Sequence, residues 1–323
     1  MSTFSPVKLS PAFKDYLWGG EKLRTEFNKH SDLVPLAESW ELSAHRDGES
    51  RISGGEYDGL PLTAYIEAIG GKKALGKNAE RFDYFPILIK FIDAKKDLSV
   101  QVHPDDAYAL ANEGEYGKTE MWYVLDCDED AALYYGFSRD VTKEEYESAI
   151  RSGTLTDLLL RVPVKKGDVF FIPAGTVHAI GAGIVICEIQ QNSNTTYRVY
   201  DYNRRDKDGN LRPLHVEKAL AVTRPFTDGE IEKIRFSCGK PQGNGELLAC
   251  SDFFKVRCVK IDGSIKETAD KDSFVSIICL DGVGCIRHLG NEYPISKGDS
   301  YFIPADMGEY EIAGKLEVIC SRI

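Results

Sequence analysis

The chain has 323 residues, of which 42% are hydrophobic and 11% aromatic, and its formal net charge is −11. This length suggests about two domains, and this composition can fill their cores, so the chain is not expected to be disordered. The acidic excess argues against nucleic-acid binding, which usually needs a basic stripe, but it leaves a small anionic substrate open.

The first 20 residues and the cysteines indicate where the protein works. The eight cysteines form no Cys-x-x-Cys pair, and residues 1–20 lack the apolar core of a secretion signal. No apolar run reaches the roughly 18 residues needed to cross a bilayer. We therefore expect a soluble cytoplasmic protein with no membrane partner, whose cysteines are buried free thiols.

Most of the chain is predicted to form short β-strands separated by turn residues. The clearest strands are rich in β-branched and aromatic residues and are expected over residues 85–93, 120–126, 131–137, 169–173 and 183–190. The second and third of these flank an acidic turn, so they are expected to form a hairpin.

Helices are predicted to be few and short. They are expected over residues 62–68, 105–112, 142–151 and 213–222. In the third, Thr142 can cap a segment with acids in its first turn and Arg151 in its last. Scattered helices among many strands favour an all-β sandwich or barrel over alternating β and α units.

One segment of the chain is repeated. Residues 166–178 read KGDVFFIPAGTVH and residues 297–309 read KGDSYFIPADMGE, so KGD, an aromatic residue and FIPA recur in register. This repetition suggests two copies of one β-roll. The stretch KPQGNG at 240–245 suits a linker. We therefore predict a catalytic domain with helical decorations over residues 1–240 and a second β-roll over residues 241–323.

Four polar residues have the spacing of a metal site. Gln101 and His103 are two apart in SVQVHPD, so on a strand they face one side. Glu120 opens a predicted strand, and His178 closes the first copy of the repeated segment. Two imidazoles, a carboxylate and an amide oxygen leave room for water or substrate and suit catalytic zinc, although iron, manganese and cobalt are also tolerated.

The motifs around these residues resemble those of known proteins. QxH, a glutamate on the next strand and PxGxxH are the pattern of cupin metal sites, with Gln101 in place of the usual first histidine. Longer stretches resemble class I mannose-6-phosphate isomerases of the short bacterial type: LWGG (17–20), ESWELSAH (38–45), FPILIKFIDAKKDLSVQVHPDD (85–106), GKTEMWYVLD (117–126), PAGTVHAIGAG (173–183) and TTYRVYDYNR (195–204). They follow the family's order.

The resemblance carries expectations about fold and chemistry. It implies a mainly β protein with a cupin-type jelly-roll barrel, a second, degenerate β-roll and a few helices. It implies an enzyme that interconverts mannose 6-phosphate and fructose 6-phosphate through an enediol, with one zinc ion per chain. The zinc ligands would be Gln101, His103, Glu120 and His178. Arg198 would be the catalytic arginine, whereas the residues alone also allow a structural pairing of Arg198 with the nearby Asp201.

Three further residues are candidates for contact with the sugar phosphate. Ser99 and Lys118 lie two residues before Gln101 and Glu120, so strand alternation places them on the same faces. Lys90 lies in an apolar strand, where an inward lysine is costly unless it meets an anion. Lys90 is therefore either a pocket cation or the base that removes the substrate proton, and a metal-bound hydroxide is the other candidate base.

The second copy of the repeat lacks the metal motif. Glu309 stands at the position of His178, and Asp306 stands at the position of Gly175. We expect this β-roll to bind no metal. Two other functions stay open: an iron-dependent cupin dioxygenase, which Gln101 and the segment TYRVYDY argue against, and a non-catalytic cupin, which the intact ligand set argues against.

Overall fold

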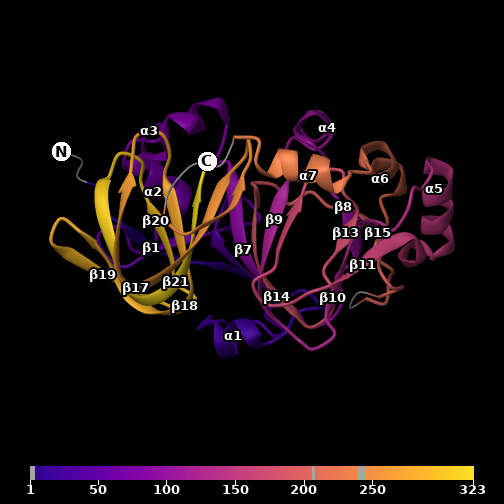
Figure 1. Ribbon diagram of the computed structural model, residues 1–323, viewed down its shortest axis with the longest axis horizontal. Helices are drawn as coiled ribbons and strands as arrows, with labels where there is room; N and C mark the ends of the chain where they lie inside the picture. The colour runs from indigo at the N-terminus through magenta and orange to yellow at the C-terminus, as the bar shows by residue number, and fades with distance from the viewer. Residues whose placement is uncertain (1–3, 206–207, 239–243) are drawn as a thin grey trace.

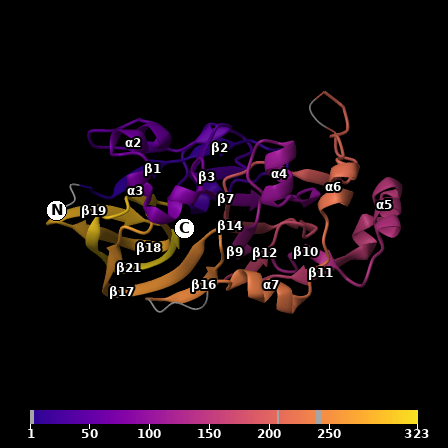
Figure 2. The same cartoon turned by 90° about the horizontal axis from the view of Figure 1, so that it is seen from above.

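The computed structural model describes residues 4–205, 208–238 and 244–323, and it is built mainly of strands (Figure 1). A six-stranded antiparallel sheet runs through the middle of the molecule (Figures 1 and 2). Its strands, in spatial order, are β12 (Val169–Ile172), β9 (Glu120–Cys127), β14 (Ile184–Gln191), β7 (Ile87–Ala94), β3 (Glu38–Leu42) and β2 (Ala12–Lys14). All five strands expected from the β-branched and aromatic runs are confirmed, four of them in this sheet.

A five-stranded sheet faces the central sheet. Its strands, in spatial order, are β11 (Leu159–Pro163), β10 (Ala132–Phe137), β13 (His178–Ala179), β8 (Val100–Val102) and β15 (Tyr197–Tyr200). Apolar side chains from both sheets, among them Trp122 and Leu133, form one core between them. Among the described residues, no strand pairing joins the two sheets into a closed barrel. The expected barrel is therefore an open jelly-roll sandwich.

A third sheet covers the other face of the central sheet. Its path is β16 (Glu246–Cys250), β17 (Lys255–Ala269), β21 (Gly308–Arg322), β18 (Val275–His288), β20 (Ser300–Ile303), β1 (Val7–Ser10) and β6 (Arg51–Ser53), and β19 (Asn291–Ser296) pairs with β18. The two-stranded ribbon of β4 (Ala44–His45) and β5 (Gly48–Glu49) stands apart. The chain thus places strands from both of its ends in one sheet. Most of the predicted linker, residues 240–243 of 240–245, lies outside the described residues, and the division into two domains stays a prediction.

Seven short α-helices lie around the sheets. They are α1 (Lys22–Glu26), α2 (Leu62–Ala68), α3 (Lys72–Leu75), α4 (Asp106–Asn112), α5 (Lys143–Ser152), α6 (Val216–Val222) and α7 (Asp228–Arg235), together with the 3₁₀ turns η1 (Lys77–Arg81) and η2 (Leu155–Leu158) within the described ranges. All four predicted helices are present, although α6 begins three residues later than expected. The cap at Thr142 is confirmed, because its side chain accepts the Glu145 N–H. In the described parts of the chain, none of the helices combines the length and apolar character of a membrane span.

The predicted hairpin at the acidic turn is wrong. β9 pairs with β12 and β14, whereas β10 pairs with β11 and β13, so the two strands lie in different sheets. The segment between β9 and β10 therefore crosses from one sheet to the other. Lys22 pairs with this segment, because its Nζ lies 2.7 Å from Asp126 and 3.0 Å from Asp128. A short acidic turn between two strands does not reveal this crossing, because local turn signals say nothing about the strand partner.

The expectation of free thiols is wrong for two cysteines. Cys238 and Cys250 form a disulfide with their Cα atoms 5.5 Å apart, where the chain returns from α7 into β16. Their spacing of 12 residues in the sequence gives no sign of this approach. The other six cysteines are free, and four of them are buried.

The two copies of the repeated segment have the same backbone structure. In the first, Gly167 N donates to Val124 O and Val124 N donates to Asp168 O; in the second, Gly298, Cys279 and Asp299 repeat both bonds. β12 and β20 are therefore equivalent, and so are β9 and β18. The interpretation of the repeat as two copies of one β-roll is confirmed.

Candidate active site

Strand alternation collects charged residues on one face of the central sheet. Lys90 in β7, Glu120 in β9 and Glu188 in β14 face the five-stranded sheet, because their neighbours on each strand point to the opposite core. The sheet register sets their order, with Glu188 opposite Lys90 on one side and Trp122 on the other. All three side chains are at most 3% exposed.

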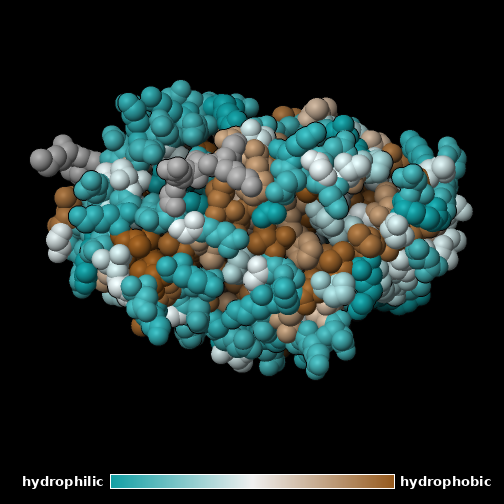
Figure 3. Space-filling model, in the orientation of Figure 1, coloured by the Kyte–Doolittle hydropathy of each residue, from teal (hydrophilic) through white to brown (hydrophobic). Residues whose placement is uncertain are grey.

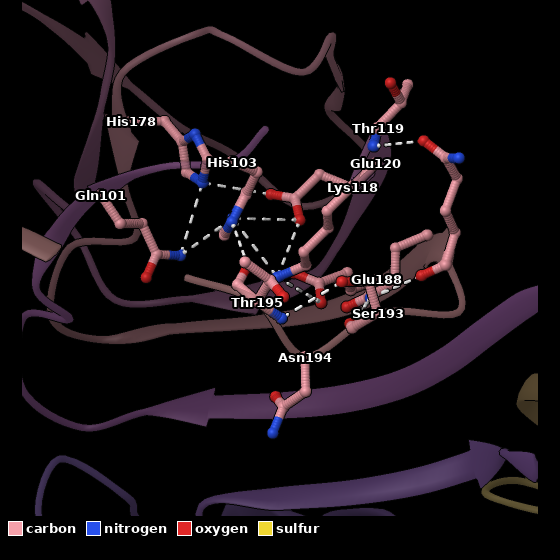
Figure 4. A network of polar contacts seen from close by, with 12 residues as sticks. Gln101, His103, Lys118, Thr119, Glu120, His178, Glu188, Ser193, Asn194 and Thr195 are labelled. Atoms are coloured by element: carbon pink, nitrogen blue, oxygen red, sulfur yellow. Dashed lines mark hydrogen bonds and ion pairs between the residues drawn. The ribbon is translucent and has the colours of Figure 1, made fainter. Parts of the chain in front are cut away.

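The four predicted metal ligands lie together. β8 and β13 pair at Gln101 and His178, and His103 follows β8 on the same side. Figure 4 shows the four side chains pointing toward one another. Glu120 Oε1 lies 3.2 Å from His178 Nε2, Glu120 Oε2 lies 3.6 Å from His103 Nε2, and the Gln101 amide nitrogen lies 3.4–3.5 Å from both imidazoles.

Both histidines are held with the same ring nitrogen facing the centre. His103 Nδ1 lies 2.9 Å from Thr195 O, and His178 Nδ1 lies 2.9 Å from Thr176 O. A backbone carbonyl accepts only from a protonated nitrogen, so Nδ1 carries the proton in both rings and Nε2 is the nitrogen that faces the centre. Burial, with a further contribution from Lys118, lowers the pKa of His103 well below its usual value and keeps this ring neutral.

Glu120 makes the arrangement suitable for a cation. The side chain is fully buried, and neither carboxylate oxygen accepts a hydrogen bond within the described structure. Burial alone would raise the pKa of Glu120, but the ammonium of Lys118 lowers it below its usual range, so the carboxylate stays ionised. The ligand atoms of His103, Glu120 and His178 all lie within 4.8 Å of one another. These residues fit a metal ion, with the Gln101 amide turned so that its oxygen faces the centre.

A cavity of about 270 Å³ opens beside this centre. Its lining includes all three predicted substrate residues, Ser99, Lys118 and Lys90, together with Gln101 and Arg198. Gln101 thus belongs to both the cavity and the ligand cluster. The structure brings together every residue that the sequence singled out for the site.

The two lysines of the cavity differ in their neighbours. Lys90 Nζ lies 3.2 Å from Glu188 and 3.7 Å from Glu38, whereas Lys118 Nζ lies 3.2 Å from Glu120 and 3.3 Å from His103 Nε2. Burial lowers the pKa of Lys90, but the three surrounding glutamates outweigh it and raise this pKa above its usual value. Lys90 is therefore held protonated, which favours its role as a pocket cation over its role as the base.

Arg198 is free of the structural pairing that the sequence left open. Asp201 accepts hydrogen bonds from Arg204 and Arg212 instead, with Arg212 Nε 2.7 Å from Asp201 Oδ2. Arg198 lies on β15 directly opposite Gln101, donates to Pro213 O at 3.2 Å, and keeps a buried Nε with no acceptor in the described structure. Its guanidinium therefore has donors left for a ligand in the cavity.

Sequence reasoning missed two carboxylates of the cavity, Glu38 and Glu188. Each lies in an otherwise buried strand, and each accepts a tryptophan N–H: Glu38 from Trp40 at 2.6 Å and Glu188 from Trp122 at 2.9 Å. A glutamate inside an apolar strand run is the signal that could have found both, since a buried carboxylate needs such partners. Arg212, which also lines the cavity, has no comparable signal.

Comparisons with known proteins agree with this geometry. A family model described as the catalytic domain of type I phosphomannose isomerase matches residues 7–128, and one described as the cupin domain of mannose-6-phosphate isomerase matches residues 245–323. The mannose-6-phosphate isomerase ManA of Bacillus subtilis is 40% identical over 324 residues, which cover 99% of this chain and all of that protein. The chain belongs to the mannose-6-phosphate isomerase family.

Other members of this family are similar over the same length. A mannose-6-phosphate isomerase of Streptococcus mutans is 40% identical over 98% of both chains. The crystal structure of the Bacillus subtilis mannose 6-phosphate isomerase superposes with a TM-score of 0.87 at 36% identity and covers 99% of this chain and all of that one. The predicted cupin fold is thereby confirmed.

Proposed function

We propose that this member of the family interconverts mannose 6-phosphate and fructose 6-phosphate, with zinc held by Gln101, His103, Glu120 and His178. The observation that carries the proposal is the cluster of His103, Glu120 and His178, whose ligand atoms all lie within 4.8 Å of one another around the fully buried carboxylate of Glu120. Lys118 Nζ already lies 3.2 Å from this carboxylate, so the feature that favours zinc is the meeting of two imidazoles and a carboxylate around one point. Zinc, when bound, would polarise the carbonyl of the open-chain sugar.

The remaining roles, stabilisation of the enediolate and contact with the substrate, are assigned to cavity residues by their positions. Arg198 and Gln101 are paired across β15 and β8, so the guanidinium lies beside the metal centre and is assigned to the developing enediolate oxygen. Lys90, held charged by its glutamates, and Ser99 are assigned to substrate contact on the cavity wall. Because Lys90 is held charged, the removal of the substrate proton is left to another group of the site, and the metal-bound hydroxide remains the candidate base.

The proposal extends to the second β-roll, residues 241–323, which is assigned no metal. The register that pairs Glu120 with Ile172 in the first roll pairs Val275 with Ile303 in the second. Val275 thus stands in place of the carboxylate ligand, as Glu309 stands in place of His178. A charged sugar phosphate does not cross membranes unaided, so the proposed location of the enzyme is the cytoplasm.

A coupled assay tests the activity. Fructose 6-phosphate formation from mannose 6-phosphate is followed for the protein as purified, after chelation, and after addition of zinc. We expect activity to vanish on chelation and to return at one zinc per chain. A zinc-loaded protein that releases no fructose 6-phosphate but consumes oxygen would replace the isomerase by a cupin dioxygenase.

A further inference from the structure

A second cavity lies outside the candidate active site. Its volume is about 400 Å³, within the range of small-molecule sites, and it shares no lining residue with the first cavity. It lies between β10 and β11 on one side and residues 224–231, which lead into α7, on the other. Figure 3, in the orientation of Figure 1, shows apolar atoms gathered on this face beside α7 and over β10 and β11.

About half of the residues that line this second cavity are aromatic or aliphatic. Phe137, Leu160, Pro225 and Phe226 contribute apolar surface. Aromatic walls of this kind bind flat apolar groups by edge and face contacts. The size of the cavity and these walls fit a ligand with one ring and a few polar atoms.

Two polar groups of the second cavity have no partner of their own. Thr176 is 4% exposed, and its hydroxyl makes no hydrogen bond within the described structure. A buried hydroxyl without a partner costs free energy, which a polar ligand atom would recover. No carboxylate in the described ranges lies within 4.0 Å of the Arg224 guanidinium, which lies over the Phe226 ring at 5.8 Å. Arg224 is thus a cation available to an anionic ligand.

The other charged groups of the second cavity are already engaged or are acidic. Arg139 donates to Glu145 at 3.0 Å, so its charge is matched. Thr227 caps α7 by accepting from Glu230 N, and the positive end of this helix points at the cavity lining. Asp140 and Asp228 also line the cavity and would repel a dianion more than a monoanion.

The wall that carries Thr176 is also the loop that positions the metal ligands. Thr176 O accepts from His178 Nδ1 at 2.9 Å, and Gly175 N donates to His103 O at 2.8 Å. Gly175 O in turn accepts from Arg224 N at 2.9 Å. A ligand that contacts Thr176 and Arg224 therefore touches both the loop itself and the residue whose backbone N–H donates to it.

We propose that the second cavity is a binding site for a small aromatic carboxylate. Its carboxylate pairs with Arg224, its ring lies between Phe137 and Phe226, and a polar atom at its other end meets the Thr176 hydroxyl. Binding fixes the loop of residues 173–178 and slows the release of zinc from His178. This last effect rests on the proposed metal centre, whereas binding itself does not.

Calorimetric titration of the zinc-loaded protein with 4-hydroxybenzoate tests the binding. We expect saturable binding that weakens at least tenfold with 4-hydroxybenzamide, the neutral analogue of the same shape. Arg224→Gln removes the charge but keeps the backbone N–H that donates to Gly175 O, and it should weaken binding of the carboxylate at least tenfold, whereas Arg139→Gln should leave binding within twofold. Equal binding of the acid and the amide, or no loss in Arg224→Gln, would overturn the proposal.

Two further measurements separate the parts of the proposal. The variant Thr176→Val keeps the shape of the side chain but loses the hydroxyl, and a thermal melt checks that the variant folds. Its affinity for 4-hydroxybenzoate should be several-fold lower. The rate at which a chelator removes zinc should fall at least threefold with saturating 4-hydroxybenzoate, and Arg224→Gln should abolish this protection. Binding with an unchanged zinc release rate overturns the coupling, and a protein that binds no zinc fails the proposed function instead.

Discussion

The two β-rolls share a turn but differ in the side chains that surround the strand beyond it. In both, a glycine with positive φ, Gly167 or Gly298, and an aspartate side chain close the entry to the strand. The first roll then places Glu120 and His178 around a centre, whereas the second has Val275 and Glu309 at the equivalent positions. The turn is therefore a structural feature that both rolls share. The chemistry depends on a few nearby positions whose side chains the fold does not determine.

The largest effect should come from substituting the equivalent positions of the two rolls. His178→Ala removes a proposed zinc ligand whose ring Thr176 O orients, so we expect loss of zinc and a fall in kcat/KM of more than about 1,000-fold. Glu309→Ala should change kcat/KM by less than about twofold. Zinc content by mass spectrometry and the coupled assay check both. Comparable losses in the two variants would mean that the second roll contributes to the site.

The next largest effect, on stability, should come from a buried ion pair that contacts the turn of the second roll. Lys29 Nζ lies 2.7 Å from Glu41 and also donates to Gly298 O in the turn of the second roll. Both side chains are buried, so Glu41→Gln leaves an uncompensated ammonium and should lower the free energy of unfolding by about 3–5 kcal/mol. Urea unfolding measures this loss. The double variant Lys29→Met, Glu41→Leu should recover most of it, and failure to do so would assign the loss to packing.

Arg198 separates chemistry from metal binding within the first roll. Because its guanidinium lines the cavity and is not one of the clustered ligand groups, Arg198→Ala should keep one zinc per chain. It should lower kcat by about 10²–10³-fold, the usual cost of one lost donor to a developing oxyanion. The exposed Arg161, which donates to Asp130 O, gives the matched control Arg161→Ala. Loss of zinc in Arg198→Ala would refute this separation of roles.

The smallest effects should come from equivalent positions in the loops that follow β12 in the first roll and β20 in the second. Gly175 has φ +96°, and a Cβ there would lie 2.9 Å from Val222 O, so Gly175→Ala should cost about 1–3 kcal/mol. Its equivalent Asp306 already adopts φ +60°, so Asp306→Gly should change stability by less than about 1 kcal/mol. Thermal melts at fixed zinc compare the two. A larger loss at Asp306 would show that its side chain, and not its backbone, maintains the second roll.

Much of the fold and site could be predicted from period-two patterns. In β7, β9 and β14 the alternation that fills two cores also places Lys90, Glu120 and Glu188 on one face. The spacing of Gln101 and His103 was informative for the same reason, because residues two apart share one side of a strand. These patterns are local, and short windows of sequence contain them completely.

The features that could not be predicted depend on contacts that no short window holds. The acidic turn after β9 looked like a hairpin because turn residues do not specify which sheet the next strand joins. Glu188 was missed because its donor Trp122 lies 66 residues away in sequence, whereas Glu38 and its donor Trp40 are only two residues apart, so that pair could have been predicted. Cys238 and Cys250 meet only because the chain reverses between α7 and β16.

The place of β1 has a consequence for how the molecule assembles. Val7 pairs with Phe302, almost the whole chain away in sequence, and β1 lies between β20 and β6 in the third sheet. A ribosome makes β1 and its other neighbour β6 long before β20, so β1 gains its second partner only after the chain between them has been made. Contacts of such long sequence separation slow folding. Once β1 and β20 have paired, they join distant parts of the chain in one sheet.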